Sequence, residues 1–260
     1  MATPGSVRVA FWHATVFRRF WVSNLLSSFF QPMLYLLGLG IGVGALVDST
    51  AGSNELLGGV SYVAYIAPGL MVTTAMMVAA TESMWPILGG FIWNRAYFGI
   101  SATPLGPADI VGGHGLWMAT RCFVTSAAVA VVLAFVPDSR SWGLIPAIFV
   151  AAYTGLAFAM PLMAFAAPRQ MDGAFPAMQR FVIIPLFLFG GAFYPITQLP
   201  GWLQVIIKVL PLWHGVELAR SFTLGDFDGT AIAMHIVVPL CWIVGGTLLA
   251  ERYFRRRLYA

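Results

Sequence analysis

Long, nearly uncharged apolar stretches constrain this chain more than any other feature of its sequence. Each is long enough to cross a hydrocarbon core of roughly 30 Å as a helix, which takes about 20 residues. Because lipid offers the backbone no hydrogen-bond partner, a helix is the expected form for a spanning segment of this kind. The sequence therefore predicts an all-α polytopic membrane protein. The five stretches cover residues 22–47, 62–88, 116–136, 143–167 and 231–250.

A further apolar segment, residues 181–194, makes the number of spans less obvious. Pro195 ends it after about 14 residues, or roughly 21 Å of helix, so it can cross only if the helix begins near Phe175. We therefore predict six spans, of which the fifth, residues 175–194, is irregular. Composition agrees, because a soluble chain of 260 residues could not bury a sequence that is 59% hydrophobic and 9% charged. The whole chain, residues 1–260, is predicted to form one membrane domain.

The Lys and Arg residues predict the orientation of the chain. If the amino terminus is cytoplasmic, ten basic residues lie in inner connections and three, Arg140, Lys208 and Arg220, lie outside, with Arg121 near the inner end of the third span. The positive-inside rule then places both termini in the cytoplasm. The inner set is Arg8, Arg18, Arg19, Arg95, Arg169, Arg180, Arg252, Arg255, Arg256 and Arg257.

Residues 7–20, ahead of the first span, alternate apolar side chains with His13 and three arginines. This pattern favours a helix lying along the cytoplasmic interface, with Trp12 and Phe17 in the headgroup region. A frayed tail is the alternative interpretation.

Glu82 is the one acidic residue well inside a predicted span. A carboxylate there costs at least about 2.5 kcal/mol on insertion scales, so it should face a helix interface, a polar cavity or water. A partner such as Arg121 on the third span is within reach. A structural ion pair and a group on a transport path both remain open, and a proton-coupling role has less support.

The connection at residues 94–115 is too long for a tight turn. Residues 101–104 interrupt it, and Pro107 followed by Asp109 predicts the start of a short helix. A short cytoplasmic helix of this kind could press on a soluble partner. The alternative is a solvated loop that ends at its prolines.

The segment at residues 187–220 is apolar but is broken by Pro195, Pro200 and Pro211. It predicts two short helices, at 201–210 and 212–221, that form a re-entrant hairpin on the outer side. Irregular backbone at that depth must be covered by protein or water, so we interpret the hairpin as an outer gate over a path.

His214 and Glu217 have i, i+3 spacing, but two ligands do not make a metal site, and an ion-pair network with Arg220 is favoured.

Several kinds of chemistry lack a motif in this sequence. It has no GxxxxGK[ST] loop for nucleotide phosphates, no HExxH and no GxSxG. Cys122 and Cys241 lie in apolar runs without paired spacing, and the basic residues do not form a nucleic-acid patch. The chain is thus predicted to bind no metal, cofactor or nucleic acid, and not to be an enzyme by itself.

Two motifs carry a resemblance to a known family. They are "ATPLGPADIVGG", residues 102–113, and the pattern F-x-P-x-x-x-L-P followed by Pro211 and Leu212. With the order of predicted helices, they resemble the permease subunit of type-2 ABC exporters, in the branch of nodulation-factor and daunorubicin-type exporters. The resemblance covers nearly the whole chain.

The resemblance implies a division of labour. Two permease subunits, identical or different, would surround a path in the bacterial cytoplasmic membrane and be in contact with its lipid. A separate nucleotide-binding ATPase subunit would bind ATP and Mg²⁺ and dock on a coupling helix within about residues 95–110. The substrate would be amphipathic: a drug, a lipid or a lipid-linked glycan, moved outward.

The resemblance and the residue patterns together select two sets of site residues. The coupling-loop candidates are Arg95, Ser101, Thr103, Pro104, Leu105, Pro107 and Asp109. The outer-gate candidates are Phe193, Pro195, Leu199, Pro200, Pro211, His214 and Glu217.

Two other classes of function remain as alternatives. A secondary transporter driven by an ion gradient would need inverted repeats and matching midplane ionisable residues, of which only Glu82 is a candidate. An intramembrane enzyme would need a nucleophile with a base, or a metal constellation, and neither is evident. Dependence on an ATPase partner would separate the exporter from the secondary transporter.

Overall fold

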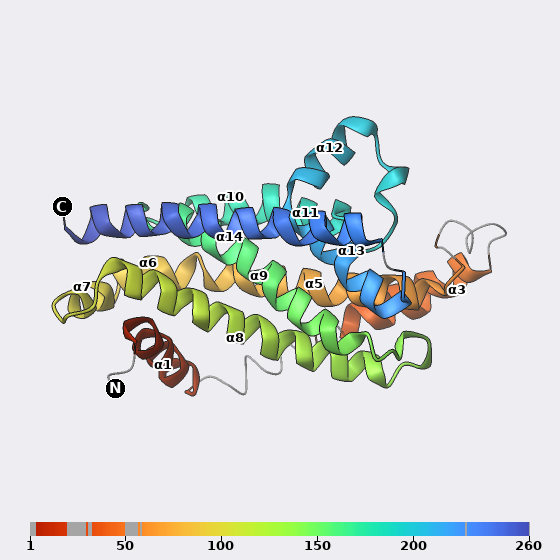
Figure 1. The fold of residues 1–260 in the computed structure, drawn as a ribbon, viewed down its shortest axis with the longest axis horizontal. Helices are drawn as coiled ribbons and strands as arrows, with labels where there is room; N and C mark the ends of the chain where they lie inside the picture. The colour runs from red at the N-terminus through yellow and green to blue at the C-terminus, as the bar shows by residue number, and fades with distance from the viewer. Residues whose placement is uncertain are drawn as a thin grey trace.

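The structure is a computed structural model that describes residues 4–19, 30, 33–49, 57, 59–226 and 228–259. Every regular element within these residues is a helix, which confirms the predicted all-α class. Figure 1 shows an elongated bundle whose long helices run broadly along its long axis. The amino and carboxyl termini lie at the same end of this bundle, which we call the terminal end.

Four helical segments within the described part of the chain are long and apolar enough to cross a membrane. Two shorter apolar helices, Met33–Asp48 and Ala174–Phe189, accompany them. Part of the first predicted span, residues 22–47, lies outside the described residues, so six spans remains a prediction. The four long segments are Tyr62–Phe91, made of α5 (Tyr62–Glu82) and α6 (Trp85–Phe91), then α8 (Pro107–Ala134), α9 (Leu144–Ala166) and α14 (Gly229–Leu258).

Helix α9 is the centre of the bundle and packs against α5, α8, α14 and the shorter α13 (Pro211–Leu224). Close approach depends on small residues: a methyl group at Gly246 of α14 would lie 2.5 Å from the backbone nitrogen of Pro161 in α9. The other side of α14 exposes apolar side chains, including Val237, Val244 and Leu248. Such a surface suits lipid or another apolar protein surface rather than water.

Helix α8 begins earlier than the sequence suggested. Pro107 and Asp109 were expected to start a short helix in a loop, but they form the first turn of a helix that continues to Ala134. The Asp109 carboxylate accepts a hydrogen bond of 3.0 Å from the backbone N–H of Gly106, which caps this start. Gly112, Gly113 and Gly115 follow without breaking the helix, because their lack of side chains lets α1 and α9 pack closely against it. The short helix of this connection is instead α7 (Ala96–Ser101).

Three other boundaries differ from the expected ones. The second span is interrupted between α5 and α6, just before Pro86, whose ring nitrogen cannot donate a helical hydrogen bond. The fifth runs through α10 (Ala174–Met178), the π-helical turn η3 (Gln179–Ile183) and α11 (Ile184–Phe189), and ends before Pro195 is reached. Gly191, at φ +84°, turns the chain there. Helix α14 continues past residue 250 to Leu258, and its last turns carry arginines.

The segment after Pro195 contains the two short helices expected from the prolines. They are α12 (Gly201–Val209) and α13, preceded by the 3₁₀ turn η4 (Ile196–Gln198). Figure 1 shows α12 standing off the bundle, while α13 turns back into it. Accordingly α12 exposes Trp202, Val205 and Val209, whereas most of α13 is buried.

Helix α1 (Gly5–Phe17) packs against α8 at the terminal end, where residues 7–20 were expected to form an interfacial helix. The contact is close at Gly113, where a methyl group would lie 2.5 Å from Val9 Cβ and 2.7 Å from the carbonyl oxygen of Ser6. The absence of a side chain at this position therefore lets α1 dock.

Replacing Gly113 with Val should displace α1 from α8, because the added side chain meets backbone as well as a side chain. Overpacking of this kind costs about 1–3 kcal/mol. A cysteine pair placed across α1 and α8 should then crosslink less efficiently than in the parent chain. Gly99→Val is the control, since a methyl group there meets nothing within 4 Å among the described residues; equal crosslinking in all three proteins would contradict this account.

Candidate functional site

The first polar site joins α5 to α8 through Glu82 and Arg121. The Arg121 Nε donates to the two Glu82 carboxylate oxygens at 2.9 and 3.2 Å, and an Nη lies 2.5 Å from one of them. The side chains are 6% exposed for Arg121 and 21% exposed for Glu82. The structure thus brings together the two residues that the sequence suggested as a pair, in a bidentate geometry that suits a guanidinium and a carboxylate.

Helix α1 covers this ion pair. The Arg121 guanidinium carbon lies 4.2 Å from the centre of the Phe17 ring, a cation–π contact from α1. One turn back on α1, the His13 ring lies edge-on to His114 of α8, with centroids 5.2 Å apart. Burial lowers the pKa of His13 to about 4, so this ring is neutral at pH 7. The docked helix therefore presents a neutral, partly aromatic surface to the pair.

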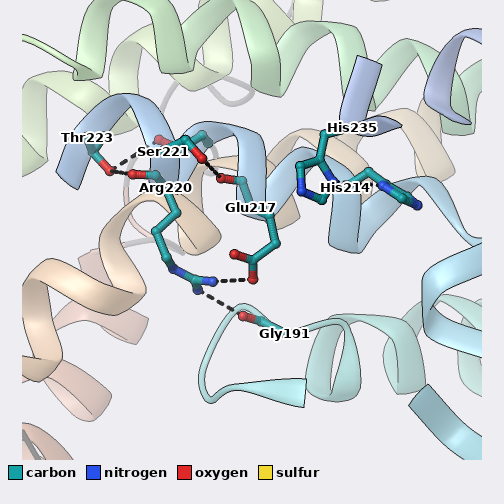
Figure 2. A network of polar contacts seen from close by, with 8 residues as sticks. Gly191, His214, Glu217, Arg220, Ser221, Thr223 and His235 are labelled. Atoms are coloured by element: carbon teal, nitrogen blue, oxygen red, sulfur yellow. Dashed lines mark hydrogen bonds and ion pairs between the residues drawn. The ribbon is translucent and has the colours of Figure 1, made fainter. Parts of the chain in front are cut away.

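The second polar site, shown in Figure 2, is centred on Arg220 of α13. Its Nη1 donates to Glu217 at 2.6 Å, and its Nη2 donates to the carbonyl oxygen of Gly191 at 2.9 Å. The guanidinium carbon also lies 3.8 Å from the centre of the Tyr65 ring in α5. Arg220 is 7% exposed, so the i, i+3 pair predicted from the sequence is a buried anchor. It ties α13 to α5 and to the turn that ends α11.

His214 does not join Glu217, as its spacing would have allowed. Its Nδ1 lies 2.8 Å from the Nδ1 of His235 in α14, and its Nε2 lies 2.7 Å from the carbonyl oxygen of Lys208. A carbonyl only accepts, so the Nε2 of His214 carries a proton and, in the neutral ring, its Nδ1 accepts from His235. Among the described residues no third His, Cys, Asp or Glu completes a metal-binding group.

The sequence interpretation did not pair His235 with this site. Twenty-one positions separate it from His214, across a loop, and no spacing rule links them. The one available signal was a polar residue in an otherwise apolar span, which by itself indicates a partner on another helix.

The candidate coupling residues surround α7 and the start of α8, at the terminal end of the bundle. Ser101 and Thr103 hydroxyls donate to backbone carbonyls within this turn, at 2.9 and 2.6 Å. Leu105 and Asp109 lie against the start of α1, because a methyl group added to Gly5 would collide with both. Helix α1 and the connection at residues 95–109 therefore form one continuous surface, which we call the α1–α7 surface.

The candidate gate residues divide between the core and the turns. Phe193 is buried and its ring lies 5.1 Å from that of Phe187 in α11. Pro195, Leu199 and Pro200 flank the η4 turn, and Pro211 starts α13. The residues thus form the turns that bring α13 back into the bundle.

Several membrane-length helices with buried ion pairs between and within them define a polytopic membrane protein. The model of the family described as ABC-2 type transporter matches residues 9–224. The chain therefore belongs to the ABC-2 type transporter family.

Curated relatives agree with this assignment. Over 237 residues the chain is 33% identical to nodulation protein J of Rhizobium leguminosarum bv. trifolii, covering 91% of this chain and 87% of the relative. Nodulation protein J of Rhizobium meliloti (strain 1021) is 31% identical over the same fractions of both chains. The inner membrane transport permease YadH of Escherichia coli K12 is 27% identical over 82% of this chain and 80% of its own length. The similarity to nodulation-type permeases suggested by the sequence motifs is confirmed.

Proposed function

We propose that this chain is the membrane-spanning subunit of an ATP-driven exporter. It would move an amphipathic substrate, such as a drug, a lipid or a lipid-linked glycan, outward across the bacterial cytoplasmic membrane. The observation that carries the proposal is the family match over residues 9–224, together with the absence of a P-loop from the sequence. ATP and Mg²⁺ would accordingly be bound by a separate ATPase subunit.

The α1–α7 surface is the proposed docking site for that ATPase. Three features support it: it lies at the terminal end, it combines two segments distant in sequence, and α1 is held to α8 by close packing. The basic residues predict that this end is cytoplasmic. Movement of the ATPase would then reach Arg121 and Glu82 through Phe17 of α1.

The outer hairpin, α12 and α13, is the proposed gate. Arg220 holds α13 against α5 and the Gly191 turn, and the contact of His214 with His235 holds it against α14. A displacement of α13 would therefore break contacts with all three. A second permease subunit would complete the path, and the exposed apolar surface of α14 leaves room for either lipid or that subunit.

The alternative of a gradient-driven transporter has less support from the structure. A proton-coupling carboxylate must take up and release its proton during the cycle, whereas Glu82 is held by a bidentate contact with an arginine.

Substitutions from the end of α7 to the first turn of α8, in the proposed coupling loop, should weaken docking of the ATPase without affecting the folding of this chain. We expect Pro104→Ala and Asp109→Asn each to lower ATPase copurification and transport by about tenfold, the effect of losing roughly 1.4 kcal/mol at an interface. Membrane insertion should be unchanged. Pro137→Ala, in the η2 turn (Pro137–Ser139) between α8 and α9, is the matched control.

Transport assays in proteoliposomes test the proposal as a whole. Uptake into inverted vesicles should require the ATPase subunit and ATP. Transport by this chain alone under a proton gradient would contradict ATP coupling, and full docking by both turn variants would contradict the proposed docking surface.

A further inference from the structure

A cavity of about 570 Å³ opens at the terminal end of the bundle, away from both polar sites described above. Its volume lies within the range of small-molecule sites, about 300–1,000 Å³, and far above the roughly 30 Å³ of one water. It is formed by the end of α6, the start of α7, the segment after α9 and the last turns of α14. Its lining residues are Phe91, Ile92, Arg95, Phe98, Gln170 and Arg257.

The lining contains two arginines and no acidic residue. Arg257 donates to the carbonyl oxygen of Ala167, and its guanidinium carbon lies 4.2 Å from the centre of the Phe91 ring. Neither arginine takes part in an ion pair between described residues. The cavity therefore offers two guanidinium groups whose charge is not neutralised by a carboxylate.

Arg95 also occupies an unusual backbone conformation. It has φ +51°, and it is the one residue other than glycine with positive φ in the described part of the chain. A left-handed conformation costs a residue with a side chain roughly 1 kcal/mol or more. Strain of this kind marks a position where the surroundings, rather than local preference, determine the backbone.

Apart from Gln170, the remaining lining residues are apolar, and two of them are exposed: Ile92 is 36% exposed and Phe98 is 40% exposed. A ligand that fits both the arginines and the apolar lining residues needs an anionic group and an apolar part. Guanidinium groups match phosphate oxygens in a bidentate geometry, and basic pockets between membrane helices bind anionic head groups. The chemistry that fits is a phosphate attached to an apolar body.

We propose that this cavity binds the phosphate head group of an anionic phospholipid in the leaflet at the terminal end. Arg95 and Arg257 hold the phosphate oxygens, and Phe91, Ile92 and Phe98 contact the glycerol and the first methylenes of the acyl chains. Because the site links α6, α7 and α14, the bound lipid joins the helix before the coupling turn to the last helix. The inference does not depend on ATP coupling.

The test uses the full chain purified in a non-ionic detergent, titrated with dioleoylphosphatidylglycerol and followed by native mass spectrometry. Phosphatidylcholine, whose phosphate is offset by choline, and inorganic phosphate are the comparison probes. We expect Arg95→Gln to weaken phosphatidylglycerol binding about tenfold, the loss expected for one charge-assisted contact. Arg256→Gln, which removes the same charge from an exposed neighbouring position outside the cavity lining, should change it less than twofold.

Arg257→Gln should weaken binding as well, but it also removes the contact with Ala167 and could reduce folding. Arg95 is exposed and makes no ion pair among the described residues, so its variant keeps the test valid if Arg257→Gln fails to fold. Gln also tolerates positive φ no better than Arg, so the variant changes charge without relieving strain.

Three results would overturn the proposal. Equal binding by the parent, Arg95→Gln and Arg256→Gln would mean that the lipid is held only by general contact with the apolar surface. Binding of inorganic phosphate as tight as that of phosphatidylglycerol, and equally weakened by Arg95→Gln, would mean that the site serves a soluble phosphate compound. Loss of ATPase copurification in Arg95→Gln with unchanged lipid binding would mean that the arginines dock an acidic segment of the partner.

Discussion

Replacing Glu82 with Gln should destabilise the protein more than replacing Arg121 with Met, although both changes break the same ion pair. The Arg121 side chain is 6% exposed, so without Glu82 a buried charge remains uncompensated. The Glu82 side chain is 21% exposed, so water can solvate part of its carboxylate when its partner is absent. We expect a loss of about 3 kcal/mol for Glu82→Gln and about half of that for Arg121→Met.

Thermal unfolding of the purified chain in detergent measures this difference. A loss of 3 kcal/mol corresponds to a Tm lower by roughly 6–12 °C for a chain of this size. The double variant should recover most of the stability, because a buried ion pair and a neutral replacement of similar volume are often equivalent. A larger loss for Arg121→Met than for Glu82→Gln would contradict the argument.

The same variants bear on the role of Glu82. If the pair only holds α5 to α8, transport per folded molecule should change little in the double variant. If Glu82 lies on the path, transport should fall in every variant that lacks it, whatever the stability. Measuring both quantities keeps these two roles apart.

Replacing Arg220 with Met should release the outer hairpin from the bundle. The change removes the ion pair with Glu217, the contact with the Tyr65 ring and the hydrogen bond to the Gly191 carbonyl. Gly191 is buried, so its oxygen loses a partner that water does not readily replace, at a cost of about 1–3 kcal/mol. We expect a total loss of about 2–4 kcal/mol and faster amide hydrogen exchange across residues 187–200.

Lys208→Met is the matched control for Arg220. It removes a positive charge from the same hairpin, but Lys208 is exposed and forms no ion pair among the described residues. Its contribution to stability should be within about 0.5 kcal/mol of zero. Unchanged exchange in Arg220→Met, or equal effects of the two variants, would show that the hairpin is held by other contacts.

The predictions that succeeded from sequence rest on local rules. Pro200 and Pro211 start helices α12 and α13 because proline suits the beginning of a helix and not its interior. The pairing of Glu82 with Arg121 could be suggested because an intramembrane carboxylate needs a partner and few candidates exist.

The difference at the start of α8 has a tertiary cause. The stretch from Gly112 to Gly115 looks like a loop by local preference, yet it lies within α8, shortly after the helix begins at Pro107. Packing against α1 and α9 outweighs the cost of glycine there, because the missing side chains allow contacts that larger residues would block. Local preference cannot report a contact with a distant helix.

The apolar runs are enough to predict an all-helical membrane protein, because segments of this length have few other stable forms, and the motifs indicate the ABC-2 type transporter family. Which polar groups lie together, by contrast, can be seen only once the helices are packed. His214 lies against His235 of α14 rather than Glu217, and Arg95 and Arg257, far apart in the sequence, line the same cavity. These pairings depend on how each helix is rotated and offset against its neighbours, which is set by packing across the bundle and not by spacing along the chain.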